Sequence, residues 1–146
     1  MTNQHAKPAW MFEQSGVIPY RFEDGQLEIM LITSQRRKRW IIPKGIVEAD
    51  MTPQESALTE AWEEAGITGR VFDEKIGCYE YDKWGGTCHV KVFLFEVKSV
   101  FSTWPEDITR DRAWLNVDEA SERVDEADLK VLIKSMPILI ENLATE

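Results

Sequence analysis

GIVEADMTPQESALTEAWEEAGI, residues 45–67, has the pattern of a glycine loop that leads into a helix. Thr52 suits the N-cap of that helix, Pro53 suits its first position, and Glu55 closes a capping box with Thr52. Gly66 stands where a residue in the left-handed conformation commonly ends a helix. These signals predict a helix that begins at Pro53 and ends before Gly66.

The predicted helix has an acidic face and an apolar face. At about 100° per residue, Glu60, Glu63 and Glu64 gather on one side. The other side carries Leu58, Ala61, Trp62 and Ala65. Two carboxylates about 6 Å apart repel by about 3 kcal/mol at an effective dielectric of about 20, so the acidic face needs a counter-ion.

Carboxylate ligands suit hard divalent cations. Mg²⁺ in particular keeps several waters and is completed by substrate phosphates instead of a full protein cage. Three glutamates by themselves, however, are more often a solvated acidic face on a surface helix. The residues around them decide between the two interpretations.

These surrounding residues resemble the Nudix box, whose family pattern is G-x5-E-x7-R-E-U-x-E-E-x-G-U, with U a bulky aliphatic residue. The matching positions are Gly45, Glu60, Glu63, Glu64, Gly66 and Ile67, and Pro43-Lys44 before Gly45 is the lead-in of many members. Met51 stands where the family has its first Glu, Thr59 stands where it has Arg, and Ala61 is smaller than usual.

The family's Arg orients the catalytic glutamates and its first Glu supports the loop. Their replacement here removes no metal ligand, and losing one charge of each sign avoids leaving a single charge unpaired. The resemblance therefore favours an active hydrolase over a degenerate relative.

The resemblance also implies roles for individual residues. Glu63 and Glu64 are the expected principal ligands of Mg²⁺, with Mn²⁺ as the alternative ion, and the carbonyl of Gly45 completes the set. Glu60 is a further ligand or the proton acceptor. In many Nudix enzymes a carboxylate from a late loop reaches the metals or acts as the base, and Glu106 is the candidate; an exposed loop acid is the alternative. A glutamate base needs a pKa raised toward the working pH, which neighbouring carboxylates supply.

The sequence has one dense basic run, made of Arg36, Arg37, Lys38 and Arg39. By itself this run fits a solvated hairpin loop. Because it directly precedes the strand that leads to Gly45, its guanidinium groups are also placed to bind phosphates in a bidentate way. Lys44, and Arg110 or Arg112 in the late loop, are further candidates for phosphate contacts.

The remaining segments predict an α+β fold. Strands are expected at 15–20, 27–33, 40–42, 69–74, 75–83, 89–97 and 114–117, after a loosely held lead-in at 1–14. A turn centred on Gly85-Gly86 would pair Lys83 with Cys88. A short helix begins at Asp118, and a longer one over 126–143 is kinked or split by Pro137 at about Met136. The resemblance implies the Nudix α/β/α sandwich with a mixed central sheet.

Composition limits the possible partners. The chain has 146 residues, 43% of them hydrophobic, and a net charge of −9, which indicates a single globular domain over 1–146. It has neither the run of about 18 apolar residues of a membrane helix nor the apolar core of a secretion signal, so we expect a cytoplasmic protein without a membrane partner. The negative charge argues against a nucleic acid polymer as partner. The oligomeric state stays open.

The Nudix family hydrolyses a diphosphate linked to another group. The basic loop followed by RWIIPKG, and the later WPE segment, resemble the subgroup that acts on diphosphoinositol and diadenosine polyphosphates. We therefore expect an anionic di- or polyphosphate of nucleoside or inositol type as substrate. The alternatives are a nucleotide-sugar or nucleoside triphosphate pyrophosphohydrolase, with Trp84 or Trp114 stacking on a base, a catalytically weakened Nudix binding module, and a purely structural acidic domain.

Overall fold

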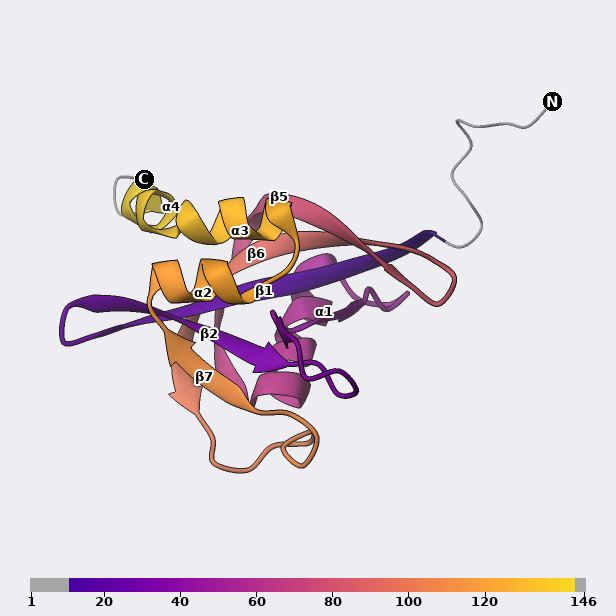
Figure 1. Ribbon diagram of the computed structural model, residues 1–146, viewed down its shortest axis with the longest axis horizontal. Helices are drawn as coiled ribbons and strands as arrows, with labels where there is room; N and C mark the ends of the chain where they lie inside the picture. Colours follow the sequence, from indigo (N-terminus) through magenta and orange to yellow (C-terminus); the bar gives the residue numbers. More distant parts are fainter. Residues whose placement is uncertain (1–10, 144–146) are drawn as a thin grey trace.

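The computed structural model describes residues 11–143. Within this range, seven strands form one mixed sheet between two layers of helix (Figure 1). The strands are β1 (Met11–Glu23), β2 (Gln26–Thr33), β3 (Trp40–Ile41), β4 (Lys44–Ile46), β5 (Ile67–Lys83), β6 (Gly86–Val100) and β7 (Arg112–Leu115). The helices are α1 (Pro53–Glu60), which continues as the π-helical turn η1 (Ala61–Ala65), α2 (Val117–Arg123), α3 (Ala127–Lys134) and α4 (Met136–Leu143). The predicted α+β sandwich with a mixed central sheet is confirmed.

The long strand β1 connects the parts of the sheet. The strand order is β3-β2-β1-β6-β5, in which β1 runs parallel to β6 and the other pairs are antiparallel. Residues 20–23 of β1 pair with β2, whereas residues 14–16 pair with β4. This division brings β4 to the middle of the sheet, directly before the chain enters α1.

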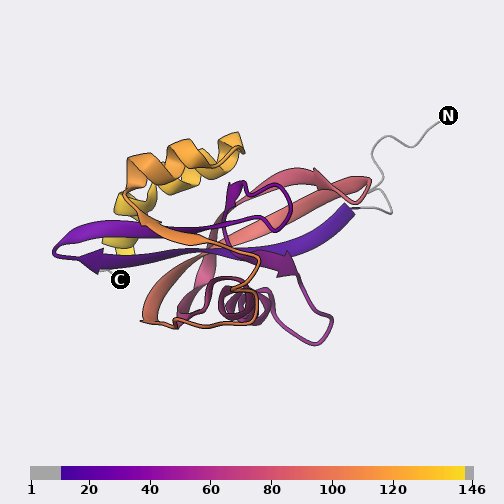
Figure 2. The same ribbon diagram turned by 60° about the horizontal axis from the view of Figure 1, so that its bottom comes forward.

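The two faces of the sheet carry separate cores. Alternation along β1 sends Val17 to one face and Ile18 to the other. On the first face, α1 and η1 pack through Ala57, Ala61 and Ala65. On the second face lie α2, α3 and α4, and Figure 2 shows the two helical layers on opposite sides of the sheet. No helix among the described residues is long and apolar enough to cross a membrane.

The apolar face of the α1 helix differs from the prediction. Leu58 was expected on the buried side, but it is 40% exposed, and Ala57 is fully buried in its place. Trp62 is half-buried and packs edge-on against Phe101. The π-helical turn that begins at Ala61 widens the helix by one residue, so the positions after it no longer follow steps of 100°.

Several boundaries also differ from the prediction. Strand β1 begins at Met11, so part of the expected lead-in is strand, and the rest of it lies outside the described residues. The expected strands at 69–74 and 75–83 are one strand, β5, interrupted by register shifts. The predicted register of the β5–β6 hairpin was wrong, because positive φ angles at Trp84 and Gly85 make a two-residue turn that pairs Lys83 with Gly86. The split before Pro137 is confirmed, since α3 ends at Lys134 and α4 begins at Met136.

Candidate active site

Both ends of the α1–η1 helix are fixed by the predicted caps. The hydroxyl of Thr52 accepts a hydrogen bond from the backbone N–H of Glu55 at 3.0 Å, and the Glu55 carboxylate accepts one from the N–H of Thr52 at 2.8 Å. At the other end, Gly66 has a φ of 67°, in the left-handed region. These caps hold the glutamates between them at a defined place against the sheet.

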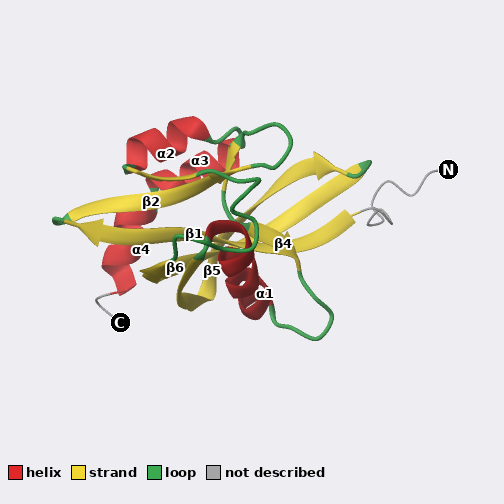
Figure 3. Cartoon of the chain, turned by 90° about the horizontal axis from the view of Figure 1, so that it is seen from below, coloured by secondary structure: helices red, strands yellow, loops and turns green. Residues whose placement is uncertain are grey.

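Glu60 lies directly against the backbone of β4. A Cβ atom on Gly45 would lie 2.7 Å from Oε1 of Glu60, so the Glu60 carboxyl group would have to move to admit it. Figure 3 shows β4 beside the helix that carries Glu60. Glycine at position 45 therefore leaves room for the carboxyl group of Glu60 in its present place.

Glu64 is the buried member of the acidic cluster. It is 7% exposed, and its Oε1 accepts a hydrogen bond from the backbone N–H of Lys44 at 3.1 Å. Its Oε2 lies 3.4 Å from Nη2 of Arg110. Burial raises the pKa of Glu64, and the charges of Arg110 and Lys44 act in the opposite direction.

Glu60 and Glu64 form a pair. Burial raises the pKa of Glu60 to about 8, and the charge of Glu64 and a side-chain hydrogen bond between the two carboxyl groups contribute to the increase. The charges of Glu63 and Glu106 raise the Glu60 pKa further. Glu60 therefore keeps its proton near neutral pH, so the pair avoids carrying two full negative charges when no cation is bound.

The predicted convergence of three glutamates is only partly seen. Among residues 11–143, no group of three or more His, Cys, Asp or Glu side chains is arranged to hold one metal ion. Glu63 is half-buried and adds to the field at Glu60, but it does not complete such a group with Glu60 and Glu64. All three were placed by α-helical spacing, whereas Glu63 and Glu64 lie in the wider π-helical turn.

The residues that do converge fit a hard divalent cation. Carboxylate and carbonyl oxygens are the ligands that Mg²⁺ accepts, and Mg²⁺ needs only one or two carboxylates because it keeps several waters. Ser15 faces Gly45 in the β1–β4 ladder, and its fully buried hydroxyl has no hydrogen-bond partner within the described range. A buried polar atom without a partner is a natural contact for such a water.

The late loop, residues 101–111, closes the end of the helix together with Arg112. N–H groups of this loop and of Arg112 donate hydrogen bonds to successive backbone carbonyls at the end of η1, which have no partner within the helix. These hydrogen bonds are Glu106 N to Glu63 O, Trp104 Nε1 to Glu64 O, Arg112 Nη1 to Ala65 O, and Phe101 N to Gly66 O. The Arg112 guanidinium also stacks 3.9 Å from the ring centre of Trp104. Arg112, predicted to bind phosphate, supports the helix C-terminus through these contacts, where a cation is favourable.

Arg110 is also engaged by the protein. Its Nε donates to Glu106 at 2.8 Å and its Nη1 donates to the carbonyl of Thr33 at 3.0 Å, while Nη2 faces Glu64. Arg110 thus links Glu106 to the glutamate pair. Sequence analysis predicted Arg110 only as an alternative phosphate contact. Its spacing of four residues from Glu106 was the one local signal of this link.

The basic loop lies beside the late loop. Lys38 donates to the carbonyl of Thr109 at 2.6 Å, and Gln35 donates to Glu106 at 3.2 Å. Arg39 forms an exposed ion pair of 3.4 Å with Asp125. The exposed side chains of Arg36 and Arg37 have no hydrogen bond or ion pair with any residue in the described part of the chain. Only these two members of the run present unengaged guanidinium groups.

Lys44 connects β4 to the opposite face of the sheet. Its Nζ lies 4.8 Å from the ring centre of Tyr81, and the Tyr81 hydroxyl donates to Gln14 at 2.8 Å. Burial lowers the pKa of Lys44 to about 8, although the charge of Glu64 favours its protonated form. The Lys44 ammonium group therefore packs on Tyr81, and the backbone N–H of Lys44 is the group that contacts Glu64.

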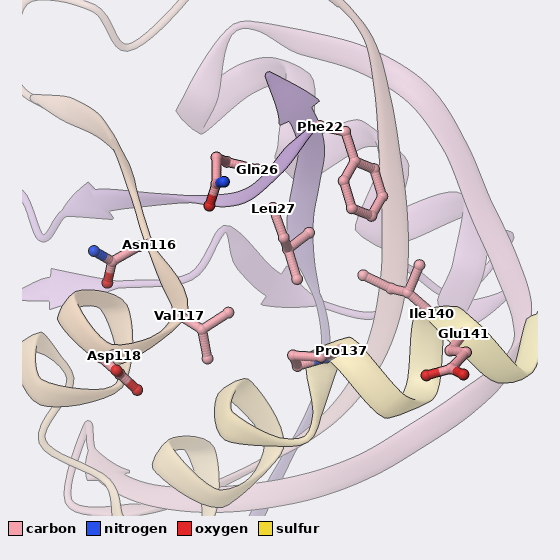
Figure 4. A pocket seen from close by; sticks show the side chains of 9 residues that line it. All are labelled: Phe22, Gln26, Leu27, Asn116, Val117, Asp118, Pro137, Ile140 and Glu141. Atoms are coloured by element: carbon pink, nitrogen blue, oxygen red, sulfur yellow. The ribbon is translucent and has the colours of Figure 1, made fainter. Parts of the chain in front are cut away.

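A separate cavity of about 410 Å³ lies at the other end of the sandwich. Figure 4 shows the β1–β2 hairpin, the start of α2, and α4 around it. It is lined mainly by apolar side chains, including Phe22, Leu27, Val117 and Ile140. None of the predicted site residues lines it, so it is distinct from the candidate active site.

Comparison with known proteins gives a consistent result. The NUDIX domain family matches residues 14–135. Nudix hydrolase 13, mitochondrial, of Arabidopsis thaliana is 37% identical over 130 residues, which cover 74% of this chain and 64% of the relative. Nudix hydrolase 4 of the same plant is 35% identical over 73% of this chain and 56% of the relative. The chain therefore spans less than two thirds of the length of either plant protein.

More distant matches extend this likeness. Diphosphoinositol polyphosphate phosphohydrolase 3-alpha of Mus musculus is 29% identical over 80% of this chain and 66% of its own length. Among solved structures, the Ap4A hydrolase of C. elegans superposes with a TM-score of 0.75 at 21% identity, covering 89% of this chain and 98% of that structure. At this identity, the structural match supports the fold alone.

Proposed function

Because this chain belongs to the Nudix hydrolase family, we propose that it hydrolyses a diphosphate linkage with the help of a divalent metal ion bound at Glu60 and Glu64. The observation that carries this proposal is the pair of partly or fully buried carboxyl groups that meet beside Gly45. A buried pair of like charges is costly unless a cation neutralises it. The family match supports a diphosphate as the group that binds beside the carboxylate pair and the cation.

The chain's own residues have distinct roles in this proposal. Glu60, Glu64 and the Gly45 carbonyl would hold Mg²⁺ or Mn²⁺, and Glu63 would contribute from the rim of the site. When bound, the ion neutralises charge on the diphosphate oxygens and makes a coordinated water more acidic. The backbone N–H of Lys44 and the guanidinium of Arg110 fix the two oxygens of Glu64.

Proton acceptance is assigned to Glu60 or Glu106. Glu60 lies within the pair, whereas Glu106 is bound by Arg110 and Gln35 at the edge of the late loop. Their separate Glu→Gln variants distinguish them, because only loss of the base removes the rise of kcat with pH. The comparison is made at saturating metal ion, since Glu60→Gln also removes a metal ligand.

We propose a nucleoside or inositol polyphosphate as substrate. Arg36 and Arg37 extend freely from the basic loop, next to the loop that carries Glu106, and multiply charged phosphates suit such groups. The names of the mouse relative and of the C. elegans neighbour specify substrates of the same two kinds. Local cations and a metal ion are needed because the net charge of −9 is unfavourable for any anion.

The alternative substrates are nucleotide sugars and nucleoside triphosphates. Trp84 is 56% exposed at the tip of the β5–β6 hairpin, although Phe12 packs edge-on against its ring and Nζ of Lys83 lies 4.6 Å from its ring centre. Trp114 is half-buried, and the Arg21 guanidinium likewise lies 4.1 Å from its ring centre. A weakened binding module remains the second alternative because of Met51 and Thr59.

A substrate panel tests the proposal. Inositol diphosphates, diadenosine polyphosphates, nucleotide sugars and nucleoside triphosphates are assayed for phosphate release with Mg²⁺, with Mn²⁺ and with a chelator. Metal-dependent turnover of the polyphosphates supports the proposal, and turnover of the mononucleotides alone supports the alternative substrates. If calorimetry detects binding of one of these compounds and no compound is turned over, the chain is a catalytically silent binding module.

We further propose that residues 1–146 act as one domain in the cytoplasm, without a nucleic acid polymer or membrane as partner. The net charge supports the exclusion of nucleic acid. Since some plant relatives have a mitochondrial designation in their names, fractionation of cells that express the tagged chain tests the location.

A further inference from the structure

We infer that Arg110 is a positioning residue of the active site, which orients Glu64 in place of the arginine that position 59 lacks. This inference rests on the proposed function. Its basis is the geometry of three contacts that converge on one guanidinium group from three separate segments of the chain.

Position 59 supplies no cation to the site. The hydroxyl of Thr59 donates back to the carbonyl of Glu55 at 3.1 Å, one turn earlier in the helix. The orientation of the neighbouring glutamates must therefore come from elsewhere in the fold.

Arg110 meets the requirements of an orienting group. It is 9% exposed, and its Nη2 faces Oε2 of Glu64 at 3.4 Å, while the backbone N–H of Lys44 donates to Oε1 at 3.1 Å. Each oxygen of the Glu64 carboxylate thus faces its own donor. The guanidinium fork is rigid and planar, so a donor of this kind fixes direction as well as charge.

The position of Arg110 is itself fixed by the sheet. Its Nη1 donates to the Thr33 carbonyl at 3.0 Å, and the next residue, Asp111, exchanges two hydrogen bonds with Thr33, from N–H to Oγ1 at 2.8 Å and from the Thr33 N–H to the Asp111 carbonyl at 3.0 Å. Glu106 holds the third nitrogen, Nε, at 2.8 Å. Groups anchored in this way to a regular element hold a site more precisely than free loop residues do.

The same contacts argue against a direct phosphate contact. All three nitrogen atoms of the guanidinium face protein oxygens, and the side chain is buried. The exposed Arg36 and Arg37 are available for that purpose, whereas Arg110 acts through Glu64.

The test compares Arg110→Gln, Arg110→Lys and the double variant Arg110→Gln/Thr59→Arg with the wild type. Arg21→Gln is the matched control, because Arg21 also pairs with a glutamate, Glu28, at 2.8 Å, but away from the site. The readouts are kcat and KM for the best diphosphate substrate, Mn²⁺ affinity by calorimetry without substrate, and circular dichroism for the fold.

For Arg110→Gln we expect kcat to fall by about 10- to 100-fold with KM within about threefold, and Mn²⁺ affinity to fall by about tenfold, the usual effect of losing a partner of a metal ligand. Arg110→Lys keeps the charge without the planar guanidinium, so its kcat and Mn²⁺ affinity should lie between those of the wild type and Arg110→Gln. In the double variant, Thr59→Arg should restore at least about half of the loss in log kcat that Arg110→Gln causes. Arg21→Gln should leave both quantities unchanged.

A folded Arg110→Gln protein with wild-type kcat and Mn²⁺ affinity would overturn the inference, as would a double variant no better than Arg110→Gln alone. If Arg110→Gln does not fold, Arg110→Lys is measured in its place, and wild-type kcat and Mn²⁺ affinity in that variant would overturn the inference. A wild type without any diphosphate hydrolysis would instead refute the proposed function, and the Mn²⁺ affinities would still test Arg110.

Discussion

Nη2 of Arg110 lies 3.4 Å from Oε2 of Glu64, and both side chains are 9% exposed. The same guanidinium binds Glu106 at 2.8 Å, so the late loop and the helix share one buried cation. Removing one member of a buried ion pair leaves an uncompensated charge and costs about 3–5 kcal/mol. Substitutions at Arg110, Glu64 and Glu106 should therefore have coupled effects instead of additive ones.

Glu64→Gln should lower kcat by at least about a hundredfold while the protein stays folded. The amide preserves the shape of the side chain but removes the charge that the metal ion and Arg110 both require. Steady-state kinetics and circular dichroism check this, with Glu122→Gln on the exposed side of α2 as control. Near-normal kcat for Glu64→Gln would remove the proposed mechanism.

Metal-free protein should lose stability as the pH rises from about 5 to about 8.5. The Glu60 pKa is raised to about 8 from an ordinary value of 4.5, so the folded protein binds this proton more tightly than the unfolded chain does. Its stabilising contribution is complete below pH 4.5 and is lost as the pH passes 8. The measurement is the melting temperature against pH, with Glu60→Gln as the flatter reference.

Mg²⁺ should reverse this trend, because it binds the ionised carboxylates. The rise in melting temperature caused by Mg²⁺ should be larger at pH 8.5 than at pH 5.5. Equal effects at both pH values would show that the ion does not compete with protons at this site.

Gly45→Ala should displace the Glu60 carboxyl group and lower kcat. The new Cβ would lie 2.7 Å from Oε1 of Glu60, and a misplacement of about 1 Å in an active site can cost about a hundredfold in rate. Gly85→Ala is the control: its φ of 70° makes the substitution strained, but no atom lies within 4 Å of the added Cβ. We expect Gly85→Ala to reduce stability and leave kcat intact, and equal kcat values for the two variants would contradict the placement of Glu60.

Neutralising Arg36 and Arg37 together to Gln should raise KM for polyphosphates by about three- to tenfold at low salt, since exposed pairs contribute about 0.2–1 kcal/mol each. The difference should shrink near 1 M salt, where the screening length is about 3 Å. Lys75→Gln/Lys134→Gln removes the same charge from exposed positions on β5 and α3 and serves as control. An unchanged KM for every polyphosphate would identify the basic loop as a solvated turn.

The parts of the fold set by local chemistry were predictable from sequence. Thr52, Glu55 and Gly66 act through neighbours a few residues away, so both ends of the helix were located correctly. Pro137 likewise divides the C-terminal helices because proline cannot continue a helix interior.

The parts set by long-range packing were not predictable. The burial of Ala57 in place of Leu58, and the wider turn at Ala61, depend on how closely the helix approaches the sheet. The contacts of Arg110 join Thr33, Glu64 and Glu106, which only the folded sheet brings together. The periodicity of residues along the chain cannot predict contacts between segments that are far apart in the sequence.

Anomalous diffraction from crystals soaked in Mn²⁺ tests the central claim most directly. We predict an anomalous peak within coordination distance of both the Glu60 and Glu64 carboxylates and beside Gly45, and no peak there in Glu64→Gln crystals. A Mn²⁺ peak confined to other parts of the molecule, or none at the wild-type glutamate pair, would contradict the account.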